Sequence, residues 1–204
     1  MSVVERLVRD SPAPEGGGDG APAERRWPWW IGLAAVLAVA LGLRVWGVKQ
    51  GMPFAYNADE NAHFVPNAIG LFGHGWNPHY FVNPPAYTYL VHAVLDVWFG
   101  GRAGVSKALA TNPTEVFVVA RLTAAAVGTL AVWLLYLAGA KLFGRATGLL
   151  AAALLAVSFL AVFYSHLALN DVPTLAPICL SLWGAAGVLR GASDPRTGGA
   201  TIAI

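Results

Sequence analysis

Long apolar runs constrain this chain more than any other feature of its sequence. An α-helix rises about 1.5 Å per residue, so about 20 apolar residues cross the hydrocarbon layer of a bilayer. Four runs have about this length, at residues 29–48, 116–143, 146–164 and 172–189. The chain is 56% hydrophobic and 12% charged, which is typical of a membrane protein and not of a water-soluble domain. We therefore predict an all-α membrane protein, folded as a polytopic helical bundle.

Basic residues orient the four predicted spans, because Lys and Arg concentrate in short cytoplasmic flanks. They gather before the first span, between the second and third, and after the fourth: Arg25, Arg26, Lys141, Arg145, Arg190 and Arg196. The loop at 165–171 has no Lys or Arg, and it falls on the opposite side together with the long loop at 49–115. We expect a multi-pass protein of the cytoplasmic membrane, with both loops on the extracytoplasmic side.

One apolar segment in the first loop is too short for a span. Residues 84–99 are interrupted by His92 and Asp96, and a crossing here would move Lys141 and Arg145 to the outside, against the charge rule. The segment is also rich in aromatic residues, which suit the membrane surface. We predict a helix that lies in or near the outer interface.

The two ends of the chain differ from the apolar middle. Residues 1–26 are rich in Gly, Pro and Ala, a composition that predicts a disordered cytoplasmic tail. Residues 27–204 form the predicted membrane domain, and because a new apolar stretch starts near its end, we expect the amino-terminal part of a longer protein. The single Cys179 lies within an apolar run, which excludes a disulfide framework, and a net charge of +2 gives no indication of nucleic-acid binding.

The candidate chemistry lies in NADENAHF, residues 57–64. Asn57 and Glu60 have the spacing of a helix capping box, and Asp59 would lie favourably at the helix amino terminus. This interpretation explains both acids without a catalytic role. Two acids close to a membrane face also indicate function, since ionisable groups are costly there. Adjacent helical residues point about 100° apart, so Asp59 and Glu60 cannot oppose each other as glycosidase carboxyls do. One acid would act as a base toward an acceptor hydroxyl, and the other would support it.

Three further positions support this site, each with a second interpretation. Arg121 is placed to hold a donor phosphate with two hydrogen bonds, or to snorkel toward the interface. Asp171 caps the fourth span, or it lines the same cavity as Asp59 together with His166 and binds a sugar or a cation. His63 shares a helical face with Asp59, which favours a local ion pair over a weak metal ligand.

Four motifs occur in the order of a known family. They are NADENAHF after the first span, NPPAYTYLVHAV in the first loop, an Arg early in the next span within FVVARLTAAAVGTL, and the polar junction YSHLALNDVPTLAP. With these motifs the chain resembles the GT-C membrane glycosyltransferases of the protein O-mannosyltransferase and aminoarabinose-transferase kind. The resemblance covers about residues 29–190 and is far more specific than a lone Asp-Glu pair.

The resemblance implies an inverting glycosyltransferase that uses a polyprenyl-phosphate sugar as donor and a hydroxyl-bearing protein, lipid or glycan as acceptor. Asp59 would be the catalytic base, and Glu60 would orient the acceptor or contribute to a cation site. No cofactor is certain, although a divalent cation is compatible with the family. Some relatives have a Lys just before the paired prolines where this chain has Asn83, which leaves the phosphate-binding group open.

Two other functional classes fit the composition. In a transporter or permease, Asp59, Glu60 and Asp171 would be proton or ion sites, which usually lie near the bilayer midplane on broken helices. Here the acids fall at helix ends and loops, and the sequence has no internal repeat. A non-catalytic binding or scaffold subunit is the third class.

Overall fold

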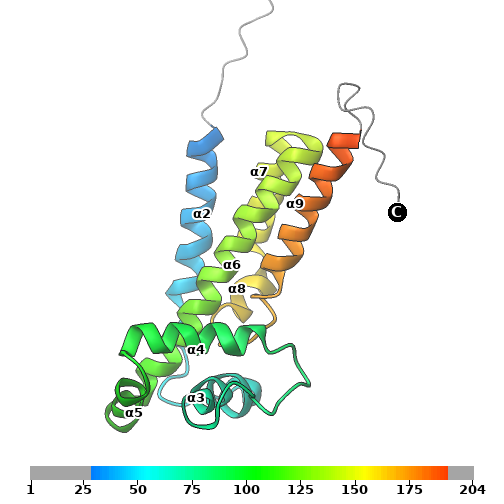
Figure 1. Cartoon of the computed structure of the whole chain (residues 1–204). Helices are drawn as coiled ribbons and strands as arrows, with labels where there is room; N and C mark the ends of the chain where they lie inside the picture. The colour runs from blue at the N-terminus through cyan, green and yellow to red at the C-terminus, as the bar shows by residue number, and fades with distance from the viewer. Residues whose placement is uncertain (1–28, 193–204) are drawn as a thin grey trace, which may run out of the picture.

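The computed structural model describes residues 29–192, which form helices and turns without a strand. The predicted all-α class is confirmed, whereas the predicted tail at 1–26 lies outside the described residues. The helices follow one another in chain order (Figure 1): α2 (Trp29–Trp46), the π-helical turn η1 (Glu60–Phe64), α3 (Val65–His74), α4 (Ala86–Phe99), α5 (Arg102–Thr111), α6 (Pro113–Phe143), α7 (Arg145–Val157), α8 (Phe159–Tyr164) and α9 (Leu175–Ala192).

A bundle of four helices forms the long part of the molecule. In Figure 1, α2, α6, α7 and α9 run side by side, and α6 packs against each of the other three. Among the described residues, α2 and α6 are long and apolar enough to cross a membrane, while α7 and α9 are shorter apolar helices. In the most apolar stretch of α6, 56% of the residues are buried, whereas 11% are buried in that of α2. Helix α6 is therefore the central helix of the bundle.

The first loop folds into a helical cap at one end of the bundle. We use "cap" for η1, α3, α4 and α5, residues 60–111. In Figure 1, α4 lies across the end of the bundle and does not run with the spans, as predicted for 84–99. It ends where Gly100 takes a left-handed conformation with φ 73° and ψ 43°, which a residue without a side chain adopts readily. Its buried face, with Val91 and Leu95 at the centre, forms a core with the start of α6.

The third predicted span is not continuous. Helix α7 ends at Val157, Ser158 is extended with ψ 120°, and α8 begins at Phe159. A helix end leaves carbonyl groups unpaired, and water is absent inside a membrane. Arg44 of α2 supplies the partner, since its guanidinium donates to the carbonyl oxygens of Ala156 at 3.1 Å and Leu155 at 3.3 Å. The break is therefore satisfied by a side chain from another helix, which local hydropathy could not predict.

Helices α6 and α7 approach most closely at two glycines. A Cβ added to Gly148 would lie 2.5 Å from the backbone nitrogen of Ala140 and 2.7 Å from the carbonyl oxygen of Tyr136. A Cβ added to Gly139 would lie 2.9 Å from the Cα of Gly148. Small residues that let backbones meet are a common means of helix association in membranes.

The close approach predicts opposite effects for two Gly→Ala substitutions. Gly148→Ala should lower the free energy of unfolding by about 1–3 kcal/mol, because the new methyl group meets backbone atoms that cannot move independently. Gly184→Ala on α9 should raise it by up to about 1 kcal/mol, since nothing lies within 4 Å of its added Cβ and Ala favours the helix. Thermal unfolding of both variants in the same detergent compares them, and equal effects would contradict this account of the contact.

Candidate functional site

The acidic pair sits on a helical turn that is capped by Asn57. The Asn57 side-chain oxygen accepts hydrogen bonds from the backbone N–H of Asp59 at 3.0 Å and of Glu60 at 3.2 Å. Asn57 therefore caps the turn, as the capping interpretation predicted. The other half of the predicted capping box is wrong, because the Glu60 carboxylate turns into the protein and binds Arg121.

The two neighbouring carboxylates lie in opposite environments. The Asp59 side chain is 59% exposed, whereas that of Glu60 is 0% exposed. This follows from the helical geometry, which turns adjacent side chains about 100° apart. Only the Asp59 carboxylate is open to a molecule that arrives from outside.

Glu60 forms a bidentate ion pair with Arg121 of α6. Arg121 donates from Nε to Oε1 at 2.6 Å and from Nη2 to Oε2 at 2.7 Å. The backbone N–H of Ala168, in the loop before α9, donates to the same Oε1 at 2.9 Å. Both oxygens of this buried carboxylate are thus held by charged or backbone donors, which is the arrangement that a buried charge requires.

The remaining donors of Arg121 bind the segment that follows α2. Nη1 donates to the carbonyl oxygens of Val48 at 2.9 Å and Gln50 at 2.8 Å. The Arg121 side chain is 2% exposed, so the predicted snorkelling is wrong. A direct contact of Arg121 with a donor phosphate stays a prediction that this geometry does not favour, because the guanidinium is enclosed and occupied.

Tyr87 of α4 joins the cap to α6 next to this ion pair. Its hydroxyl donates to the carbonyl oxygen of Ala120 at 2.9 Å, and its ring meets Phe64 edge-on. Burial, and next the negative charge of Glu60, raise the pKa of Tyr87 well above its usual range. The hydroxyl therefore stays protonated and remains a donor.

A short row of side chains extends from Asp59 through His63 and Tyr80 to Asn83. His63 Nε2 lies 3.9 Å from Asp59 Oδ1, which agrees with the predicted local ion pair. The His63 imidazole stacks on the Tyr80 ring with centroids 4.5 Å apart, and Asn83 donates to the Tyr80 hydroxyl at 3.2 Å. The loop before α4 thereby holds the Tyr80 ring against His63, which lies next to the exposed carboxylate of Asp59.

His166 and Asp171 have less direct links to Asp59. A ring nitrogen of His166 makes a 2.9 Å hydrogen bond to the carbonyl oxygen of Leu43, and the ring packs against Gly47. Asp171 is exposed, and it does not begin the fourth span, because α9 starts only at Leu175 after a turn. Within the described part of the chain no hydrogen bond or ion pair joins either residue to Asp59, and their roles as sugar or cation ligands stay predictions.

Residues 29–192 contain no group of three or more His, Cys, Asp or Glu side chains that could together hold a metal ion. Glu60 is committed to Arg121, so Asp59 is the carboxylate of the pair that a cation could reach. One exposed carboxylate beside one imidazole is a poor site for a hard cation, which takes about six oxygen ligands. The described side chains around Asp59 therefore do not fit a divalent cation.

Arg44 is a buried residue whose importance the sequence prediction missed. It is 0% exposed although it lies on a span, and it also donates to the carbonyl oxygen of Ala40 at 3.0 Å. Its Nε has no hydrogen-bond partner among the described residues. A charged residue inside an apolar run is itself a signal that a structural or functional partner exists.

The buried ion pair predicts an asymmetric response to mutation. Arg121→Met should lower the free energy of unfolding by about 3–5 kcal/mol, because it leaves the Glu60 charge buried without its partner. Replacing both residues by Met should cost less than this single change. Thermal unfolding measures both variants.

Arg145→Met is the matched control, because Arg145 is exposed. It should change the free energy of unfolding by no more than about 0.5 kcal/mol. A double variant that is less stable than Arg121→Met would argue against an energetic coupling of Glu60 and Arg121.

The comparison with known families covers part of the chain that forms this site. The model of the dolichyl-phosphate-mannose-protein mannosyltransferase family matches residues 108–197, less than half of the 204-residue chain. The matched range contains Arg121, His166 and Asp171 and excludes Asp59. No curated protein and no solved structure matches the chain significantly. Over residues 108–197 the chain is therefore similar to a family of mannosyltransferases, and this similarity supports the predicted GT-C resemblance.

Proposed function

We propose that this protein transfers a sugar from a polyprenyl-phosphate donor to a hydroxyl acceptor, with inversion, at the extracytoplasmic membrane face. The observation that carries the proposal is the exposed carboxylate of Asp59 on a turn whose next residue is locked inside the protein. The family match supports the reaction class. A catalytic base must be accessible and carried by a fixed backbone; the Asp59 side chain is exposed, and its backbone N–H is held by Asn57.

The reaction that we assign to Asp59 is one displacement. The carboxylate accepts the proton of the acceptor hydroxyl while the hydroxyl oxygen attacks the anomeric carbon. The bond between that carbon and the phosphate oxygen breaks, and polyprenyl phosphate departs with the electron pair. The leaving group requires no protonation because phosphate is already a stable anion, so one base is sufficient.

We assign Glu60 and Arg121 to positioning. Their ion pair, together with the carbonyl groups after α2 and the Ala168 amide, connects four segments of the chain around the base of the turn. A misplacement of about 1 Å can lower a rate by about a hundredfold. The pair would therefore act on catalysis through Asp59.

His166 and Asp171 belong to the loop that the Glu60 contact holds in place. Asp171 is exposed and could accept hydrogen bonds from sugar hydroxyls, whereas His166 is occupied by the backbone of α2. We infer that Asp171 is the stronger candidate for a substrate ligand. We do not assign Arg121 as the group that neutralises the departing phosphate, because opening a buried ion pair costs several kcal/mol.

Asp59→Asn tests the proposed base. The substitution preserves shape but removes the proton acceptor, so transfer should fall by roughly 10²–10⁴-fold. Folding should be retained, since the side chain is largely exposed. The assay follows release of polyprenyl phosphate from polyprenyl-phosphate mannose by the purified full-length protein, with donor binding and thermal unfolding measured in parallel.

Asp96→Asn is the matched control, because Asp96 is an exposed acid on α4 of the same cap. It should leave transfer unchanged. Full transfer by Asp59→Asn would reject Asp59 as the base. The purified protein, reconstituted into proteoliposomes, also tests the transporter class. Ion flux that disappears in Asp59→Asn, without sugar transfer by the parent protein, would favour that class instead.

A further inference from the structure

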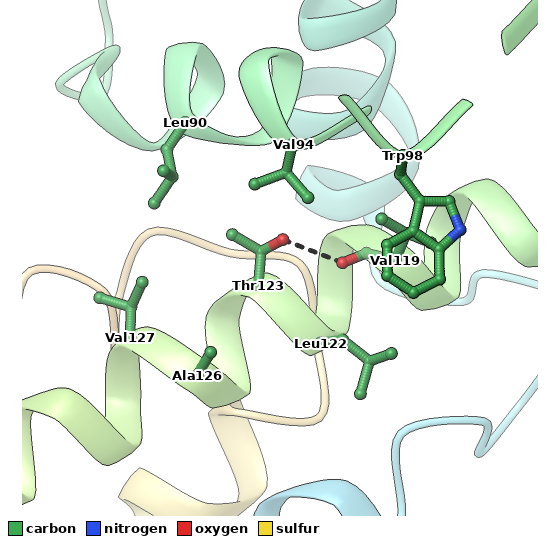
Figure 2. Close-up of a pocket in the computed structure, with 8 residues that line it drawn as sticks. All are labelled: Leu90, Val94, Trp98, Val119, Leu122, Thr123, Ala126 and Val127. Carbon is green, nitrogen blue, oxygen red and sulfur yellow. Dashed lines mark hydrogen bonds between the residues drawn. The ribbon is translucent and has the colours of Figure 1, made fainter. Parts of the chain in front are cut away.

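An apolar groove lies between α4 and α6, outside the proposed catalytic site. Figure 2 shows Leu90, Val94 and Trp98 of α4 above residues of α6 between Val119 and Val127. We call this space the α4–α6 groove. Its volume is about 360 Å³, which is within the range of small-molecule sites.

The one hydroxyl that lines the groove is not free to bind a ligand. Thr123 donates its hydroxyl to the carbonyl oxygen of Val119 at 3.0 Å, the bond drawn in Figure 2. The other lining side chains are aliphatic or, for Trp98, an indole that is 63% exposed. Indole rings favour the headgroup level of a bilayer, where one edge meets apolar chains and the other meets water. The chemistry of the groove is therefore that of a hydrocarbon chain.

The groove lies at the level where α6 leaves the hydrocarbon layer. With 31 residues, α6 is about 46 Å long, against a hydrocarbon thickness of about 30 Å. If Lys141 marks the headgroup level at one end, the other boundary falls about 20 residues earlier, near Arg121 and within one helical turn of Thr123. Leu122, Ala126 and the exposed Leu130 follow one another at helical spacing. The groove is thus continuous with the lipid-facing surface of α6.

The groove also faces away from the polar site. Successive helix residues turn by about 100°, so Val119 and Thr123 point about 160° from Arg121, and Ala126 about 140° from it. Arg121 faces Glu60 and the acidic turn. The donor of the proposed reaction would have to reach Asp59 on that side of α6. The occupant of the groove is therefore a lipid other than the reacting donor.

We propose that the α4–α6 groove binds an acyl chain of a bilayer phospholipid. The chain would fill the space below α4 and hold this helix against the bundle. Because α4 also carries Tyr87 over the Glu60 ion pair, the bound lipid would support the cap from the side opposite the acidic turn. The choice of a phospholipid over the donor tail rests on the proposed function, whereas the apolar groove itself does not depend on it.

Photo-crosslinking tests the proposal on the full-length protein. The protein is placed in vesicles of phosphatidylglycerol and phosphatidylethanolamine that contain a trace of a phospholipid with a diazirine in its acyl chain. Crosslinks are mapped by mass spectrometry, and we expect them to concentrate on α4 and on α6 between 119 and 127. Ala126→Phe should fill the groove and reduce crosslinking to α4 several-fold. Leu90→Ser, which makes the α4 wall polar, should do the same.

Leu130→Phe is the matched control, since Leu130 is 44% exposed on the same helix beyond the groove. It should leave the crosslinks on α4 unchanged. Thermal unfolding identifies a groove variant that fails to fold. In that case, crosslinking to α4 in the other groove variant tests the proposal. Equal crosslinking to α4 in the parent and the groove variants would overturn the proposal. So would displacement of the label by polyprenyl phosphate and not by unlabelled phospholipid, because the occupant would then be the donor tail.

Discussion

The buried ion pair between Glu60 and Arg121 is the interaction on which the arrangement of the cap depends. Two opposite charges removed from water are stable only if their remaining hydrogen-bonding capacity is also satisfied. Here Val48 and Gln50 supply carbonyl groups to the cation, and Ala168 supplies an amide to the anion. The end of the first span, the acidic turn, the central helix and the loop before α9 therefore meet at one point. None of these segments can move alone without breaking a hydrogen bond to one of the two buried charges.

A second buried guanidinium meets a related requirement inside the bundle. Arg44 binds carbonyl groups at the end of α7, where Ser158 interrupts the helix. An interrupted helix within a membrane must find partners for its backbone, because neither water nor lipid provides them. The two arginines thus join backbone segments that secondary structure leaves unsatisfied: Arg44 at a helix break, and Arg121 at the turn after α2. One guanidinium reaches several carbonyl groups from one position, three for Arg44 and two for Arg121.

The sequence predicted the features that follow from local periodicity and hydropathy. Helix class, the long apolar helices α2 and α6, and the helix at 84–99 across the end of the bundle depend on residues that are close in the chain. The hydrogen bonds from the backbone of Asp59 and Glu60 to the Asn57 side chain also join close neighbours, and they were predicted. The Glu60–Arg121 pair joins residues 61 positions apart, and the Arg44 contacts join residues more than 100 apart. No local pattern contains these pairings, and for this reason the capping box failed for Glu60 and the third span was predicted as continuous.

Helix α6 separates two chemically different surfaces, and this separation follows from one stretch of its sequence. Arg121 is followed directly by Leu122 and Thr123, and the turn of about 100° per residue carries the chain from a buried cation to an apolar groove within two residues. A polar site at a membrane surface must keep hydrocarbon chains away from its charges, since lipid would desolvate them. A helix that presents a charge on one side and accepts hydrocarbon on the other achieves this separation. Helix α4 contacts both sides, because Tyr87 donates to the carbonyl oxygen of Ala120, next to Arg121, and Leu90, less than one turn further along α4, lines the groove.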